Sequence, residues 1–243
     1  MFALYKKEMQ SFFYSPFAYV LAALFMFIFS LSFVPSIGSM DSNTLKFSYP
    51  NIFYNNFFYF IFLIPILTMR SFSDERKGGT EVLLISSPLS VFKIVMAKFL
   101  SIATVFLFMM VVSLFFPIVT MVKGEVMWSS LICAYTGFYL WGLACIAVGM
   151  LFSALNDNAI IAAILGEIVM EGFLFLDKFA ATELVASYPK LNSVITWFSL
   201  QRRFVFFSQG LFRLEDLVYF LSFTAVFLCW IVIAIEKRRW SRS

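Results

Sequence analysis

The feature that most constrains the fold of this chain is a series of long apolar segments with few charged residues. Each is close to the roughly 20 residues that a helix needs to cross the hydrocarbon core of a bilayer. Helices are expected because backbone polar groups in lipid have no water to bind and must bond within the segment. With 13% charged residues, the chain also falls below the roughly 25% typical of soluble domains. We predict an all-α integral membrane protein, one transmembrane domain over residues 1–243, whose six transmembrane helices cover residues 17–37, 52–69, 99–122, 126–152, 159–176 and 216–235.

Two segments outside these spans are expected to lie at the membrane surface. Residues 1–16 place Lys6, Lys7 and Glu8 among aromatic residues, a pattern typical of an amphipathic interfacial helix. Residues 177–215 form a long segment between the fifth and sixth spans, and they are too apolar for a free loop. We expect this external segment to lie on the outer leaflet or to dip into it.

The distribution of basic residues predicts the orientation. An even number of spans places both ends on one side of the membrane. Of the 18 basic residues, eleven fall on the side of the two ends and of the loop at residues 70–98, and seven on the other side. Because basic residues are enriched in cytoplasmic loops, we predict a multi-pass protein of the cytoplasmic (inner) membrane with both termini in the cytoplasm.

The only long internal stretch that is both charged and patterned covers residues 70–98, and we expect it to be a structured cytoplasmic loop. Gly78 and Gly79 can supply the positive backbone dihedrals of a tight turn. Thr80 then makes an N-cap, with Glu81 in the first turn, where the helix dipole favours a carboxylate. The short apolar helix that follows has about two turns, which is too short to be stable alone. We therefore expect a neighbour, another protein, to hold it.

This loop resembles that of a known protein family. Its E…GTxExLLxxP…K pattern is similar to the first cytoplasmic loop of permease subunits in type-2 ABC exporters, especially the gliding-motility and nitrous-oxide-reductase-maturation (NosY-like) branch. The matching residues are Glu75, Gly79, Thr80, Glu81, Leu83, Leu84, Pro88 and Lys98. The resemblance implies a coupling helix that docks into a groove of a separate ATPase subunit. Its coupling residues would be Glu75, Arg76, Gly79, Thr80, Glu81, Val82, Leu84, Ile85 and Pro88.

An alternative for this loop is a solvated segment at the membrane surface whose basic residues face lipid head groups.

The external segment carries a second resemblance, to the stretch before the last helix of the same family. The matching residues are Phe204, Phe207, Gly210, Asp216, Tyr219 and Phe220. The chain departs from the family at Leu200, where proline is usual, and at Arg202 and Arg203, where histidine or tyrosine is common.

For the external segment, the resemblance implies short re-entrant helices that close the top of the pathway. The candidate gate residues are Arg202, Arg203, Phe204, Phe207 and Gly210. The alternative is an interfacial helix that only anchors the bundle.

Two carboxylates, Glu167 and Glu171, fall within the fifth apolar span. A charged side chain at mid-bilayer costs about 2.5 to 3.5 kcal/mol on insertion scales, so these groups should avoid lipid. At i and i+4 they share one helix face. Our hypothesis is that this face borders the substrate path at a dimer interface and favours a cationic or hydrogen-bond-donating substrate. The alternative is structural, with Glu171 at the outer boundary and Glu167 bonded within the bundle.

Several kinds of chemistry are excluded by composition. The chain has no histidine, which excludes a Ser-His hydrolase and a His-ligated zinc site. It has no phosphate-binding loop of the G-x-x-x-x-G-K-[ST] type, and Cys133, Cys145 and Cys229 lie in apolar spans at no metal spacing. Its basic residues flank apolar spans, which argues against nucleic-acid binding. We predict no catalytic residue, metal or cofactor in this chain, with ATP and Mg on a partner.

The resemblance implies a permease subunit of an ATP-driven ABC exporter that is not itself an enzyme. Its expected partners are two ATP-binding cassette subunits and a second permease chain, identical or homologous, with further membrane or extracytoplasmic subunits possible on this scaffold. Two alternatives stay open: a proton-coupled secondary transporter that uses Glu167 and Glu171, and a non-transporting membrane anchor. The substrate is left open, because fold alone does not determine cargo.

Overall fold

The computed structural model describes residues 1–38, 46–47, 49–81, 89–123, 125–180, 182 and 187–241. Six of its helices are long and apolar enough to cross a membrane, which confirms the predicted all-α membrane architecture. The long helices are α2 (Pro16–Gly38), α3 (Tyr49–Thr68), α6 (Val91–Ser113) continued by α7 (Phe115–Lys123), α8 (Trp128–Leu155), α9 (Ala159–Ala180) and α13 (Leu214–Ser241). The shorter helices are α1 (Phe2–Tyr14), α4 (Arg70–Lys77), α11 (Pro189–Trp197) and α12 (Leu200–Ser208).

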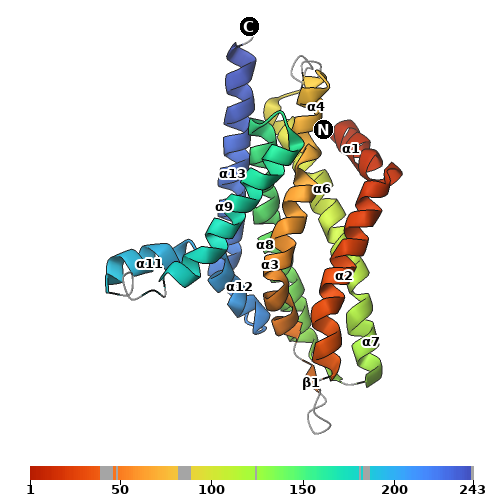
Figure 1. Ribbon diagram of the computed structural model, residues 1–243, viewed down its shortest axis with the longest axis vertical. Helices are drawn as coiled ribbons and strands as arrows, with labels where there is room; N and C mark the ends of the chain where they lie inside the picture. The colour runs from red at the N-terminus through yellow and green to blue at the C-terminus, as the bar shows by residue number, and fades with distance from the viewer. Residues whose placement is uncertain are drawn as a thin grey trace.

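The helices form one elongated bundle with α8 at its centre (Figure 1). Both chain termini lie at the same end of the bundle, which we call the termini end, and the opposite end is the distal end (Figure 1). At the distal end, β1 (Lys46–Phe47) and β2 (Glu125–Val126) pair in parallel. Of the six long apolar helices, α8 is the most buried and α9 the least.

Small residues on α8 let its neighbours approach closely. A Cβ atom at Gly142 would lie 2.2 Å from the Phe106 ring on α6, and one at Gly149 would lie 2.1 Å from the Thr68 hydroxyl on α3. Lipid tails are as apolar as the side chains, so association of membrane helices depends on such close van der Waals packing. The glycines therefore fix how α3 and α6 sit against α8.

An aromatic core fills the centre of the bundle. Its middle is Phe138 of α8, which is fully buried. Rings from α2, α3, α6 and α12 lie within 6.4 Å of the Phe138 ring, centroid to centroid. Tilted and edge-to-face aromatic pairs of this kind add stabilisation beyond their buried area. Segments far apart in the chain are thus held by one cluster.

The segment at the termini end differs from the loop expected after the second span. Residues 70–77 form α4, which follows α3 after the single turn residue Met69, whose backbone is itself in the helical region. The amide of Met69 donates to the carbonyl of Pro65 at 2.8 Å, so the chain stays helical across the junction. Glu75 and Arg76 of α4 are accommodated because Lys98 of α6 pairs with Glu75, and Asp157 and the carbonyl of Ala154 bind Arg76.

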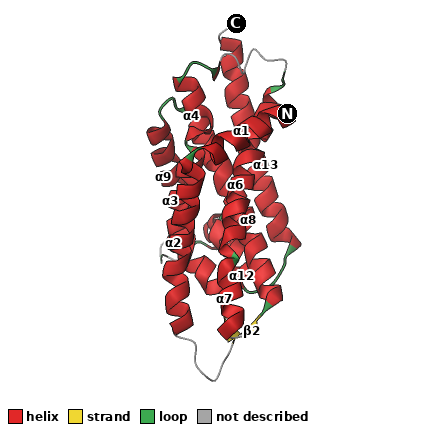
Figure 2. Cartoon of the chain, turned by 90° about the vertical axis from the view of Figure 1, so that its right-hand side faces the viewer, coloured by secondary structure: helices red, strands yellow, loops and turns green. Residues whose placement is uncertain are grey.

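In the described residues between α9 and α13, the chain forms two short helices at the distal half of the bundle. Helix α11 projects to the side of the bundle (Figure 1), and none of its described side chains is buried. Helix α12 packs against α8 and α3. The view turned by 90° places α12 in the distal half of the bundle and α4 at the termini end (Figure 2).

Candidate functional site

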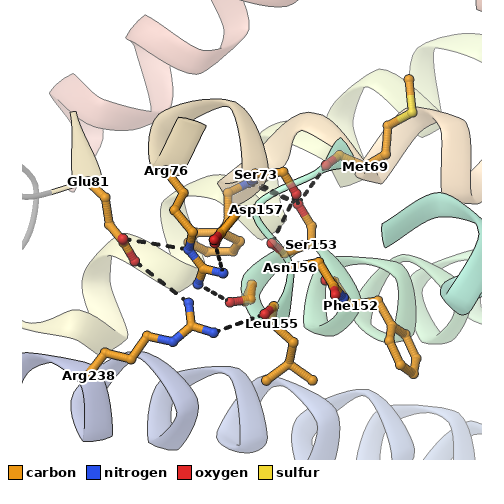
Figure 3. A network of polar contacts seen from close by, with 12 residues as sticks. Met69, Ser73, Arg76, Glu81, Phe152, Ser153, Leu155, Asn156, Asp157 and Arg238 are labelled. Carbon is orange, nitrogen blue, oxygen red and sulfur yellow. Dashed lines mark hydrogen bonds and ion pairs between the residues drawn. The ribbon is translucent and has the colours of Figure 1, made fainter. Parts of the chain in front are cut away.

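A pair of buried serines fixes α4 to the end of α8. The Ser153 hydroxyl accepts hydrogen bonds from the backbone amides of Phe72 and Ser73, at 3.1 and 3.2 Å, and donates to the carbonyl of Met69 at 2.7 Å. The Ser73 hydroxyl donates to the carbonyl of Ser153 at 3.1 Å. These amides belong to the first turn of α4, where backbone N–H groups have no partner within the helix. The Ser153 side chain of α8 therefore caps the first turn of α4 (Figure 3).

Arg76 connects α4 to the carboxyl end of α8. Its Nη1 lies 2.7 Å from Oδ1 of Asp157, and its Nη2 donates to the carbonyl of Ala154. Its Nε lies 3.6 Å from Oε2 of Glu81, and the Arg76 side chain is only 10% exposed. A cation is favoured at a helix C-terminus because the last carbonyls carry partial negative charge. The forked guanidinium can bind a carboxylate and a carbonyl at once.

Glu81 lies between two arginines from different helices. Its Oε1 is 4.0 Å from Nη1 of Arg238 on α13, while its Oε2 faces Arg76. Arg238 also donates from Nη2 to the carbonyl of Leu155 at 3.1 Å. Glu81 is the last described residue before residue 89. The start of the segment that follows is therefore tied to α4, α8 and α13 through one carboxylate (Figure 3).

A buried lysine forms a second polar cluster on the same short helix. Nζ of Lys98 on α6 lies 3.1 Å from Oε1 of Glu8 on α1 and 2.9 Å from Oε1 of Glu75 on α4. It also donates to the carbonyl of Ser71 at 2.7 Å. The ammonium group has three hydrogens, and each has a partner here. The Lys98 side chain is 2% exposed, so burial is compensated by complete pairing.

The two clusters together make a polar junction, which we define as Glu8, Ser73, Glu75, Arg76, Glu81, Lys98, Ser153, Asp157 and Arg238. Helix α4 is its centre, because α4 bonds directly to α6 and α8, is linked through Lys98 to α1 and is linked through Glu81 to α13. A movement applied just beyond α4 would therefore be passed to several helices at once.

A turn follows α4. Gly79 has φ of +70°, and Gly78 has φ of −81°, so the expected positive dihedral is found at the second glycine. The Thr80 hydroxyl donates to the carbonyl of Glu75 at 3.2 Å, which binds it back to α4. The predicted coupling residues Val82, Leu84, Ile85 and Pro88 lie outside the described residues. Ser90 precedes α6 as its N-cap residue, and its backbone carbonyl accepts from the amide of Lys93 at 2.9 Å.

At the distal end, α12 inserts its aromatic residues into the bundle. Phe204 and Phe207 are fully buried, and the Phe204 ring lies 4.5 Å from that of Phe57 on α3, centroid to centroid. Helix α12 ends at a glycine in the left-handed region, since Gly210 has φ of +78°. The amide of Leu211 donates to the carbonyl of Phe206 at 2.9 Å, which is the bond pattern of a Schellman C-cap.

A buried ion pair ties α12 to α13. Nη1 of Arg203 lies 3.0 Å from Oδ1 of Asp216, whose side chain is 2% exposed. The Arg203 guanidinium also lies 4.9 Å from the centre of the Tyr219 ring, and the Tyr219 hydroxyl donates to the carbonyl of Phe198 at 2.9 Å. The neighbouring Arg202 is exposed. Arg203 thus holds α12 and α13 together.

Glu167 and Glu171 lie on α9, the most exposed of the long helices, and both are partly buried. No hydrogen bond or ion pair joins either carboxylate to another residue in the described part of the chain. Their neighbours Ile164 and Ile168 are exposed. The two carboxylates therefore lie at the border of an apolar face that the described part of the chain does not cover.

A comparison with protein families shows to which family the chain belongs. A family model described as an ABC-2 family transporter protein matches residues 34–235. The chain belongs to the ABC-2 transporter family. No curated protein sequence matches it. The matched range of this ABC-2 family protein runs from the end of α2 into α13 and includes α4, Lys98 and α12.

Several residues of the polar junction were not singled out by sequence reasoning. In this ABC-2 family protein these are Glu8, Ser73, Ser153, Asp157 and Arg238. The sequence signals for them were weak, because charges and serines near helix ends are common. Lys98 was part of the family pattern, but its pairing with Glu8, 90 residues away, is visible only in three dimensions.

Proposed function

We propose that this ABC-2 family protein is the membrane-spanning permease subunit of an ATP-driven exporter in the cytoplasmic membrane. Its partners are two separate ATP-binding cassette subunits and a second permease chain, and its termini end faces the cytoplasm. The observation that carries the proposal is the placement of Glu81. It belongs to the coupling-loop pattern and directly precedes residues 82–88, and it is paired with Arg76 of α4 and Arg238 of α13.

The proposed mechanism follows from this placement. ATP-driven closure of the ATPase subunits pushes the segment at residues 82–88 against the bundle. Glu81 passes the displacement to Arg76 and Arg238, and these arginines bind carbonyls at the end of α8. Because α8 is the central helix, a shift at its end changes the packing of its neighbours. Helix α12 closes the pathway at the distal end in this mechanism, with Phe204 and Phe207 in the aromatic core and Arg203 on α13.

The docking step is tested with a tagged protein purified from its native membranes. We expect a subunit with a phosphate-binding loop to co-purify. Leu84→Asp should abolish its recovery, because a charge in an apolar docking groove is costly to desolvate. Leu211→Asp is the matched control, since Leu211 is 51% exposed at the distal end. Unchanged recovery with Leu84→Asp would contradict docking through this segment.

The coupling step is tested separately with Glu81→Gln. This change keeps the shape of the side chain and removes the charge that both arginines face. We expect the ATPase still to co-purify, while substrate-stimulated ATP hydrolysis falls several-fold. Glu215→Gln, at an exposed position in the first turn of α13, is the control and should leave hydrolysis unchanged. If Glu81→Gln behaves like the control, force is not transmitted through Glu81.

Glu167 and Glu171 are the proposed translocation-path residues, on the uncovered face of α9 that a second permease chain would border. The double substitution Glu167→Gln with Glu171→Gln should lower transport several-fold and leave ATPase co-purification intact. The proton-coupled alternative makes a different prediction, because collapse of the pH gradient by an ionophore would stop transport even with ATP present. Normal transport by the double variant would remove both roles for these carboxylates.

A further inference from the structure

A mixed polar and apolar cavity of about 270 Å³ opens at the termini end, between α1, the start of α2, α4 and α6. Phe12 and Phe17 supply apolar walls, and the floor includes Ser71 and Lys98. Its lining shares Glu8, Glu75 and Lys98 with the polar junction and does not include Arg76, Glu81 or Arg238.

The charges that line the cavity are balanced. Its basic residues are Lys7, Arg70 and Lys98, and its acidic residues are Glu8, Asp74 and Glu75. At the floor, Lys98 forms ion pairs with Glu8 and Glu75. At the mouth, Arg70 and Asp74 are 3.9 Å apart and each side chain is more than half exposed, a geometry worth little as an ion pair. The mouth therefore offers cations and an anion that can bind a ligand carrying both charges.

One buried group in the cavity has unused hydrogen-bonding capacity. Ser71 is 7% exposed, and within the described part of the chain its hydroxyl oxygen has no hydrogen-bond partner. A buried polar group without a partner costs free energy, and such a group in a native structure calls for an explanation. Ser71 is one of the residues that line the cavity, and its hydroxyl oxygen is itself buried, so rotation of this side chain toward the cavity would let a ligand oxygen accept its hydrogen bond.

The position of the cavity relates it to the membrane. The Arg70 guanidinium lies 5.0 Å from the centre of the Phe17 ring, and Phe17 is in the first turn of the apolar helix α2. Exposed apolar residues continue from this point along both helices at helical spacing. They are Val20, Leu24, Phe27 and Leu31 on α2 and Phe58, Phe62 and Ile66 on α3. A lipid-facing surface thus begins where the polar cavity ends.

We propose that this cavity binds the zwitterionic headgroup of a phospholipid that carries a phosphate and a primary ammonium. The phosphate is held by Lys7 and Arg70, with the Ser71 hydroxyl rotated toward it, and the ammonium group is held by Asp74. The acyl chains lie over the exposed stripes of α2 and α3. Charged hydrogen bonds of this kind are stronger than neutral ones, and the balance of charges favours a zwitterion over an anionic lipid.

The test is native mass spectrometry of the purified, delipidated protein in detergent, titrated with phosphatidylethanolamine. Phosphatidylglycerol with the same chains probes the headgroup charge, and glycerophosphoethanolamine probes the headgroup without chains. We expect phosphatidylethanolamine to bind most tightly. Lys7→Gln with Arg70→Gln should weaken it roughly tenfold or more, the scale of losing one or two charged hydrogen bonds. Lys93→Gln with Arg239→Gln removes two exposed basic residues outside the cavity and should leave the affinity for phosphatidylethanolamine unchanged.

A variant that blocks the cavity sterically tests the site without changing its charge. Ser11 is exposed and lines the cavity, so Ser11→Trp should fill the mouth without disturbing the core, and it should also weaken binding. Equal or tighter binding of phosphatidylglycerol would overturn the zwitterion assignment. Equal binding of glycerophosphoethanolamine would show that the chains contribute nothing and would overturn the lipid assignment. Unchanged binding in both cavity variants would overturn the site itself.

Discussion

At the scale of single residues, Lys98 shows how a membrane protein keeps a charge inside its fold. An unpaired ammonium in a low-dielectric interior is strongly unfavourable. Lys98 is acceptable because two carboxylates and a carbonyl surround its Nζ. The pairing makes each partner dependent on the others, since removal of the lysine would leave Glu8 and Glu75 close together without a cation.

We therefore expect Lys98→Met to lower the free energy of unfolding by about 3–5 kcal/mol, the usual cost of breaking a buried ion pair from one side. Lys93→Met is the matched control on the same helix, where the side chain is exposed, and it should change stability by less than about 0.5 kcal/mol. Unfolding of the purified protein in mixed micelles with increasing denaturing detergent measures both. The triple variant that adds Glu8→Gln and Glu75→Gln should regain much of the loss, and no recovery would argue against carboxylate repulsion as the cause.

At the scale of elements, the contact of α3 with α8 depends on the absence of a side chain at Gly149. The Thr68 hydroxyl occupies the space that a Cβ atom would need, and it donates to the carbonyl of Ile64 on its own helix at 3.1 Å. Thr68 and Gly149 come shortly before Ser73 and Ser153 in the sequence. The same contact therefore supports the orientation of α4. A separation of α3 from α8 would loosen the polar junction.

Gly149→Ala should therefore destabilise the protein by about 1–3 kcal/mol, the range for overpacking a close contact. Gly172→Ala on α9 is the control, because no atom lies within 4 Å of a Cβ atom there and alanine favours helix by up to about 1 kcal/mol. The same detergent unfolding experiment compares them. The double variant Gly149→Ala with Thr68→Ala removes the nearest clashing atom and should recover part of the loss. If both glycine variants behave alike, close α3–α8 approach is not the constraint.

At the scale of the whole molecule, the two ends of the bundle differ. Both termini lie at one end (Figure 1), and α12 lies toward the other (Figure 2). The termini end holds the polar junction, with ionic contacts among α1, α4, α6, α8 and α13. The distal end holds α12, whose aromatic residues enter the core and whose Arg203 pairs with Asp216. This asymmetry suits a protein that is driven from one side and opens on the other.

The orientation is testable by labelling with a membrane-impermeant maleimide in intact cells. In a background without Cys133, Cys145 and Cys229, we expect Gln209→Cys to react, because Gln209 is exposed at the end of α12. Lys77→Cys, exposed at the end of α4, should react only after the cells are permeabilised. The reverse pattern would place the termini outside and would remove the basis for contact with a cytoplasmic ATPase.

The sequence by itself determined the number and kind of the spans, because lipid admits few backbone structures and each apolar segment has spanning length. It also located the glycine turn at Gly79, since a positive backbone dihedral depends on local chemistry. It did not predict that residues 70–77 form helix α4, because their charges indicate solvent. Only the tertiary structure brought Lys98 to Glu8 and Glu75, and Glu81 to Arg238. Those charges are stable in a helix at the end of the bundle because their partners come from distant parts of the chain, and no local pattern records that proximity.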